Sequence, residues 1–356
     1  MNHIKVKNIT TPYGYKELQW LIDGKSLPEY LEEWKMEFDE KTMHYVKTFC
    51  DLCPAWTKKL DWYGDVRFVW KLIEKDNSIL PVLLCPDDLD FSCIVMVVEV
   101  EKNNDFVYWN QIGYVLHANE DFREEKEKGI LDLEAYSDRD WDMYGDNIAC
   151  ADVDSEEWRQ WISENWDEEL YRRRMNYTYP HYQKEGSVCW IHEMNWVFAR
   201  DEYDRITEEF WKYETLSQLN KFQRKNKITV KECAHLLSTL TRDGKELLTE
   251  HIYDYGEILL HLFASEQVGE PLTVLLDDSP EDKTAVLIYC RAIEIMWRYG
   301  NDAVVNVVDV TLLERLSDKS EVWEKFGSYI SDDFKNYIND SVLKENLMMG
   351  GVRPLQ

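Results

Sequence analysis

Two cysteines in the N-terminal part of the chain have a spacing that proteins use for redox chemistry and for metal binding. Cys50 and Cys53 form a CxxC motif, but Pro54 follows directly, where a thioredoxin-type site needs the start of a helix. A zinc site needs four ligands, and the sequence has no second CxxC motif. Three residues could complete a ligand set only if folding brought them close: His44, Cys85 and Cys93. Two half-buried thiols at a turn are therefore the favoured interpretation, and we expect neither a metal nor a cofactor.

A second pattern begins like the helix motif of zinc peptidases. The residues His192-Glu193-Met194-Asn195-Trp196 place Trp196 where the second ligand histidine must stand. We therefore expect His192 to be an ordinary strand residue. The sequence also lacks the phosphate-binding patterns GxxxxGK[ST] and GxGxxG and the nucleophile pattern GxSxG. These observations predict that the protein is not an enzyme, although a catalytic site assembled from distant residues stays open as an alternative.

The segment Asp138–Asp146 sets aromatic side chains among carboxylates. Its sequence, DRDWDMYGD, has the composition of a contact surface for a basic protein. The alternative interpretation is an acidic loop that Trp141 pins to the core of its own chain. The candidate partner-binding residues are Asp138, Asp140, Trp141, Asp142, Tyr144, Asp146, Glu156 and Glu157.

The elements that would position these residues begin with a strand and a helix. Glu17–Ile22 is strand-like, Asp23-Gly24 is a turn signal, and Ser26 with Glu29 has the spacing of a helix capping box. Four β-branched or aromatic runs separated by turn residues then predict an antiparallel sheet of three or four strands. These runs are Val66–Ile73, Ile79–Cys85, Ser92–Val100 and Phe106–Trp109. Because Ser92–Val100 is apolar on both faces, we expect it to be a central strand.

The second half of the chain is richer in helix signals. Asp154-Ser155-Glu156-Glu157 predicts a helix start, and Arg172, Arg173 and Arg174 suit its C-terminal end. Two strands are expected over Val188–Ile191 and Asn195–Ala199, followed by a helix over Glu202–Glu214. A connector between the two halves of the chain is expected over Leu216–Lys227. Helices should follow, starting at a Thr229–Glu232 capping box and at Ser279-Pro280-Glu281-Asp282, with Val304–Val310 as a strand or a buried connector.

These patterns predict an α+β fold in two domains. Residues 1–220 should contain an antiparallel sheet with flanking helices, and residues 228–356 a mainly α-helical domain. The formal charge of −28 disfavours binding to duplex nucleic acid and to anionic membranes, and would attract a cationic protein. Met1–Thr10 does not resemble a signal peptide, and eight scattered cysteines do not form a disulfide framework. We therefore expect a cytoplasmic protein with reduced thiols.

Two resemblances to known families add to this interpretation. Three stretches resemble immunity proteins encoded beside bacterial polymorphic toxins: PYGYKELQWLIDG (Pro12–Gly24), LPVLLCPDDLDFSC (Leu80–Cys93) and YWNQIGYV (Tyr108–Val115). A fourth stretch resembles a small helical domain of uncharacterised function from the same kind of bacterial gene neighbourhood: DVTLLERLSDKSEVWEKFGSYI (Asp309–Ile330). Neither resemblance brings a catalytic or metal-binding residue set.

The resemblance to immunity proteins implies a stoichiometric inhibitor. Such a protein binds its cognate toxin in the producing cell and occludes the active site, and many of these toxins are basic nucleases. An acidic surface would speed association with such a partner. Direct binding to nucleic acid or to a membrane is not expected. The alternatives are an acidic nucleic-acid mimic that inhibits a DNA-binding protein, an enzyme with a site assembled from distant residues, and a scaffold role in a larger assembly.

Overall fold

The protein consists of two compact units, Met1–Trp211 (unit 1) and Lys212–Gln356 (unit 2). A computed structural model describes residues 1–10, 16–46, 49, 51–116, 122–278, 282–346, 349 and 351–356. Unit 1 contains both sheets, and unit 2 is mainly helical. The predicted α+β class is thus confirmed.

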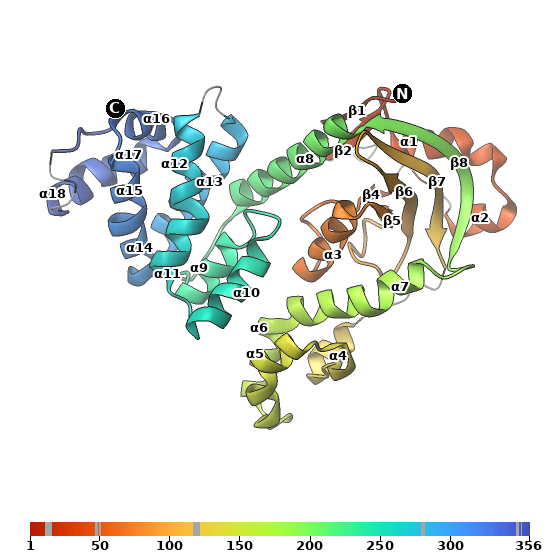
Figure 1. Cartoon of the computed structure of the whole chain (residues 1–356), viewed down its shortest axis with the longest axis horizontal. Coiled ribbons are helices and arrows are strands. Elements are labelled where there is room, and N and C mark those ends of the chain that lie inside the picture. The colour runs from red at the N-terminus through yellow and green to blue at the C-terminus, as the bar shows by residue number, and fades with distance from the viewer. Residues whose placement is uncertain are drawn as a thin grey trace. The chain divides into compact units, whose positions relative to one another are not determined.

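Unit 1 is built on a five-stranded antiparallel sheet with the order β4-β5-β6-β7-β8 (Figure 1). The strands are β4 (Cys53–Pro54), β5 (Asn77–Leu84), β6 (Val95–Lys102), β7 (Phe106–Val115) and β8 (Val188–Ala199). The predicted central position of the third apolar run is confirmed, because β6 is the middle strand. The two strands expected between residues 188 and 199 form a single strand, β8, which contains Asn195 with a positive φ of 52°.

A smaller antiparallel sheet precedes the five-stranded one. It consists of β1 (Ile4–Thr10), β2 (Lys16–Ile22) and β3 (Lys25–Ser26). Asp23 and Gly24, with φ angles of 49° and 91°, make the predicted turn between β2 and β3. Positive φ at both central residues is the geometry of a type I′ hairpin turn.

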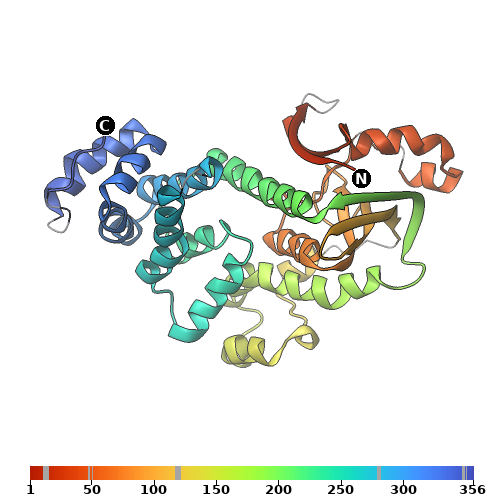
Figure 2. The same cartoon turned by 45° about the horizontal axis from the view of Figure 1, so that its top comes forward.

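The prediction of a strand over Val66–Ile73 is wrong, because this segment lies within helix α3 (Tyr63–Glu74). Every residue of the segment except Lys71 is buried. Figures 1 and 2 show α3 between the five-stranded sheet and helix α6 (Glu156–Arg173). A helix covered on two sides has few polar positions, so the 3.6-residue period that marks an amphipathic helix is weak in its sequence.

The other helical elements of unit 1 connect and cover the sheets. They are α1 (Leu27–Trp34), η1 (Lys35–Glu37), α2 (Glu40–Tyr45), α4 (Arg123–Lys128), η2 (Leu133–Ala135), α5 (Asp138–Ala149), η3 (Arg174–Thr178), α7 (Tyr179–Tyr182) and α8 (Arg200–Lys221), the last of which continues into unit 2. The core beside the sheet is aromatic. Trp56 lies 4.6 Å from Trp20, 5.9 Å from Phe210 and 6.4 Å from Trp109, measured between ring centroids. The predicted Ser26–Glu29 capping box at the start of α1 is confirmed.

Unit 2 is a set of short helices around its own hydrophobic core. Its elements are α9 (Val230–Leu237), α10 (Gly244–Tyr255), α11 (Leu260–Ala264), η4 (Ser265–Gly269), α12 (Glu270–Asp277), α13 (Lys283–Tyr299), α14 (Asp302–Val307), η5 (Val308–Leu312), α15 (Leu313–Ser317), α16 (Ser320–Tyr329), α17 (Asp332–Tyr337), η6 (Ile338–Val342) and α18 (Leu343–Glu345). The Thr229–Glu232 capping box at α9 is confirmed. Residues 279–281 of the predicted second helix start lie outside the described residues, and Asp282 caps α13 by accepting from the Ala285 amide at 3.0 Å.

The expectation of a strand or buried connector over Val304–Val310 is wrong. The segment belongs to α14 and the π-helical turn η5. Val304, Val307 and Val308 are buried at a spacing of three and four residues, which is the helical spacing. Their β-branched side chains suggested a strand, but packing in the core of unit 2 overrides that weak preference. Among the described helices, none combines the length and the apolar character required to cross a membrane.

Candidate functional site

The candidate partner-binding residues lie on helices α5 and α6 of unit 1. Figure 1 shows α4 and α5 on the side of α6 that faces away from the five-stranded sheet. The side chain of Ser155 caps α6 by accepting from the Trp158 amide at 3.0 Å, which confirms the predicted helix start. Trp158, Ile162, Trp166 and Leu170 form one buried stripe along α6. This stripe makes a small separate core that holds α6 in place.

Buried ion pairs fix α6 and the turn that follows it to α3. Arg174 Nε donates to Asp65 Oδ1 at 2.8 Å, and both side chains are 0% exposed. Burial raises the pKa of the Asp65 carboxyl, and the Arg174 guanidinium opposes this rise. Arg67 and Glu168 form a second ion pair between the two helices at 2.7 Å. The position of α6 relative to α3 is therefore set by charged contacts as well as by packing.

The other two arginines of the Arg172–Arg174 run are also neutralised within the unit. Arg173 pairs with Glu169 at 2.9 Å, and Arg172 pairs with Asp140 of α5 at 2.9 Å. The Arg172 guanidinium also lies over the ring of Tyr136, 4.2 Å from its centroid. These arginines end the helix as predicted, but they act as internal counter-charges more than as helix-dipole partners. These three arginines are therefore matched by carboxylates of the same unit.

Two of the candidate residues turn out to be part of the internal structure. Asp140 accepts from the backbone amide of Ser137 at 2.9 Å in a capping box that opens α5. Tyr144 is partly buried, with its ring 5.8 Å from that of Trp161 on α6, and burial raises its pKa to about 12. Asp140 and Tyr144 lie four residues apart and both contact α6 residues, so they define the inner face of α5. The segment expected as a possible loop is thus a helix with a fixed orientation.

The remaining candidates of α5 are exposed on its other face. Asp138, Asp142 and Asp146 follow each other at four-residue spacing, so their carboxylates form a row about 6 Å apart along the helix axis. Trp141 lies beside this row with 42% of its surface exposed, and its ring is 5.6 Å from that of Tyr136. We call Asp138, Trp141, Asp142 and Asp146 the α5 acidic face.

Glu156 and Glu157, the last two candidates, are exposed in the first turn of α6. The connection between the two helices adds the exposed Asp152 and Asp154 and an exposed Val153. Residues 138–157 contain eight carboxylates and one arginine. The arrangement can attract and orient a cationic surface, with Trp141 as an apolar contact inside the acidic region.

The two metal-like sequence patterns have different outcomes. Cys50 lies outside the described residues. Cys53 is buried on β4, and its Sγ donates to the Leu84 carbonyl at 3.6 Å. Burial raises the pKa of the Cys53 thiol to about 12. His192 lies in strand β8, as predicted, and stacks on Trp34 with 4.0 Å between ring centroids. His192 thus has the contacts of a packed strand residue, whereas the interpretation of the Cys50–Cys53 pattern stays a prediction.

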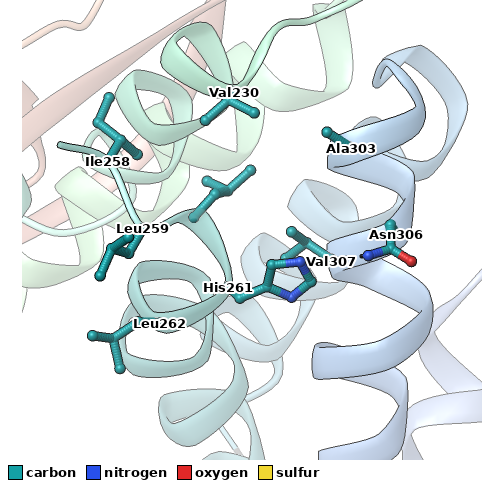
Figure 3. Close-up of a pocket in the computed structure, with 9 residues that line it drawn as sticks. Val230, Ile258, Leu259, His261, Leu262, Ala303, Asn306 and Val307 are labelled. Atoms are coloured by element: carbon teal, nitrogen blue, oxygen red, sulfur yellow. Dashed lines mark hydrogen bonds between the residues drawn. The ribbon is translucent and has the colours of Figure 1, made fainter.

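A pocket in unit 2 has no counterpart in the sequence patterns. Its volume is about 530 Å³, and its lining is mostly aliphatic: Val230, Ile258, Leu259, Leu260, His261, Leu262, Ala303, Asn306 and Val307. Figure 3 shows His261 and Asn306 facing each other, and His261 also hydrogen bonds to Thr311 at 2.6 Å. The pocket can bury apolar surface but brings no set of carboxylates or thiols into contact with it.

Comparison with known proteins identifies one part of the chain. Residues 244–344, within unit 2, match the family model described as a domain of unknown function (DUF7674). No curated protein and no solved structure matches the chain. The expected helical domain of uncharacterised function at the C-terminal end is thereby confirmed, whereas the resemblance of unit 1 to immunity proteins rests on the sequence stretches alone.

Proposed function

We propose that the protein is an immunity protein that binds and neutralises a cognate bacterial toxin by stoichiometric occlusion. The α5 acidic face would form part of the contact surface, with Glu156 and Glu157 at its margin. One observation carries the proposal: a row of exposed carboxylates lies beside an exposed tryptophan on a helix that internal ion pairs hold in a fixed orientation. The proposal involves no catalytic step and no cofactor.

The distribution of charge supports a cationic partner. Arg172, Arg173 and Arg174 are engaged with carboxylates inside unit 1, so they do not offset the exposed acids of α5. A concentrated acidic surface accelerates encounter with a basic protein, and a basic nuclease is a toxin of this kind. The rigid backbone also lowers the conformational cost of binding.

Trp141 supplies an apolar contact surface, which carboxylates alone cannot provide. Charged pairs at the rim of an interface mainly affect the association rate, whereas buried aromatic side chains dominate the dissociation rate. Trp141 is already partly ordered by Tyr136, so its burial against a partner would cost little additional side-chain entropy. We therefore assign steering to the three aspartates and anchoring to Trp141.

The test combines toxin rescue with binding kinetics. A candidate toxin, chosen from the products of the adjacent genes, is co-expressed with the wild-type chain, and growth rescue and the association rate are measured. Changing Asp138, Asp142 and Asp146 to Asn should slow association by roughly ten-fold or more at low salt. The matched control changes the exposed Asp318, Glu321 and Glu324 of unit 2 to their amides, which removes the same charge and should have little effect.

Three outcomes separate the functions. Failure of the wild-type chain to rescue growth or to bind the toxin would overturn the immunity proposal. Equal effects of the two triple variants would leave immunity in place but remove the α5 acidic face from the interface. Binding to several unrelated DNA-binding proteins would favour the nucleic-acid mimic, which the regular spacing of the three aspartates also suits.

A further inference from the structure

The loop between β5 and β6 brings two thiols and a carboxylate together. The ligand atoms of Cys85, Asp88 and Cys93 all lie within 4.8 Å of one another. The Cys85 amide donates to the Ile94 carbonyl at 3.1 Å, which closes the base of the loop and places Cys85 beside Cys93. The Leu89 amide donates back to the Cys85 carbonyl at 3.2 Å, and this turn returns Asp88 to the two cysteines.

The rest of the loop is fixed independently of these three side chains. Asp90 is buried, accepts from the Ser92 amide at 2.8 Å and pairs with Arg123 at 2.9 Å. Phe91 is buried 5.5 Å from the ring of Phe68. Leu89 has a positive φ of 49°, a backbone conformation that costs energy for any residue other than glycine. The loop therefore holds the cluster in place at some energetic cost.

We propose that Cys85, Asp88 and Cys93 bind a zinc ion. Two thiolates and one carboxylate are ligand types that zinc accepts, whereas thiolates disfavour magnesium and calcium. Ligand sulfurs of a tetrahedral zinc site lie about 3.8 Å apart, given a Zn–S distance of about 2.3 Å. The two sulfurs, which lie no more than 4.8 Å apart, would have to approach each other by at most about 1 Å to reach that geometry. Three protein ligands leave one coordination position to water.

A zinc ion would displace the protons of the two thiols on binding. Among the described residues, Cys53 and His44 do not belong to the cluster.

The proposed ion would link the neighbouring strands β5 and β6 at the end where the chain leaves the sheet. Cys85 follows directly after β5, and one residue, Ile94, separates Cys93 from the start of β6. Binding would thus stabilise unit 1, whatever partner the α5 acidic face recognises. The inference does not depend on the proposed immunity function.

The test is a cobalt and zinc titration of the full-length, reduced and chelator-treated protein. Tetrahedral cobalt–thiolate absorption should appear, saturate at one equivalent and disappear when zinc is added. The Cys93→Ser variant should lose the absorption, and Asp88→Asn should weaken cobalt affinity at least ten-fold. Both residues are partly exposed, so these variants should fold, as circular dichroism would verify. Cys150→Ser, which removes an exposed cysteine elsewhere, should titrate like the wild type.

Three results would overturn the site. The first is the absence of cobalt–thiolate absorption in folded wild-type protein. The second is absorption that survives in both Cys93→Ser and Cys85→Ser. The third is a Cys85–Cys93 disulfide, seen by peptide mass analysis of the unreduced protein, together with no bound zinc after reduction.

Discussion

Replacing Arg174 by Met should destabilise unit 1 strongly, because the buried Asp65 carboxylate would lose the guanidinium with which it forms an ion pair. Both side chains are 0% exposed in the native protein. In addition, Asp65 Oδ2 has no hydrogen-bond partner among the described residues, so its ionised form depends on Arg174. Breaking a fully buried ion pair typically costs about 3–5 kcal/mol. We expect a loss of free energy of unfolding in that range near neutral pH.

Urea unfolding followed by tryptophan fluorescence measures this loss. Thirteen of the 15 tryptophans precede Lys212, so the signal reports mainly on unit 1. With a urea dependence of about 1–3 kcal/mol per M, the midpoint should fall by at least about 1 M. The control is Arg205→Met, which removes an exposed ion pair with Glu209 and should cost about 1 kcal/mol or less.

The pH dependence provides a second readout of the same variant. Burial already raises the pKa of Asp65 in the folded state, and loss of Arg174 should raise it further. A raised folded-state pKa favours folding at low pH and is a growing cost as the pH rises above the unfolded value. The deficit of Arg174→Met should therefore be smaller at pH 5 than at pH 7.5. Adding Asp65→Asn should recover at least half of the deficit at pH 7.5. A deficit no larger than that of Arg205→Met, or one independent of pH, would refute a buried ionic contact.

Three further predictions concern other sites. Gly64→Ala should destabilise unit 1 by roughly 2 kcal/mol or more in urea unfolding, because its Cβ would lie 2.4 Å from the Asp167 carbonyl oxygen. The control Gly145→Ala should be neutral or stabilising, because its Cβ would lie at an ordinary contact distance of 3.6 Å from the Trp141 ring. Thr229→Ala removes the side-chain cap of α9 and should lower the free energy of unfolding of unit 2 by about 1 kcal/mol, with Thr229→Ser as the milder control. Burial raises the pKa of Asp309, so wild-type unit 2 should lose stability relative to Asp309→Asn as the pH rises from 4 to 7. Thermal melts of the two proteins measure this difference, and equal pH dependences would contradict the prediction.

Local signals in the sequence predicted much of the fold. Capping residues such as Ser26, Ser155 and Thr229 marked real helix starts, because a cap acts within one turn of the chain. The two wrong strand predictions share one cause. Val66–Ile73 and Val304–Val310 are densely apolar and β-branched, and their helical state depends on the surfaces that cover them.

The candidate site was only partly predictable. The Ser137–Asp140 spacing is itself a capping signal that could have indicated helix α5 in place of a loop. The cluster of Cys85 and Cys93 could have been anticipated, since both cysteines lay at the facing ends of consecutive predicted strands. The ion pair between Asp65 and Arg174 could not, because 109 residues separate them and no local pattern links the two.

The internal ion pairs should restrict which substitutions can accumulate as copies of this gene diverge. A lineage that loses Arg174 carries an unfavourable buried carboxylate until Asp65 also changes, so the two positions should be replaced together or not at all. Asp138, Asp142 and Asp146 are under no such mutual constraint, because each is exposed and can be exchanged singly. We therefore expect diverging copies of this gene to keep the Asp65–Arg174 pairing as a unit while the exposed face of α5 drifts rapidly, which would let one scaffold acquire new recognition without refolding.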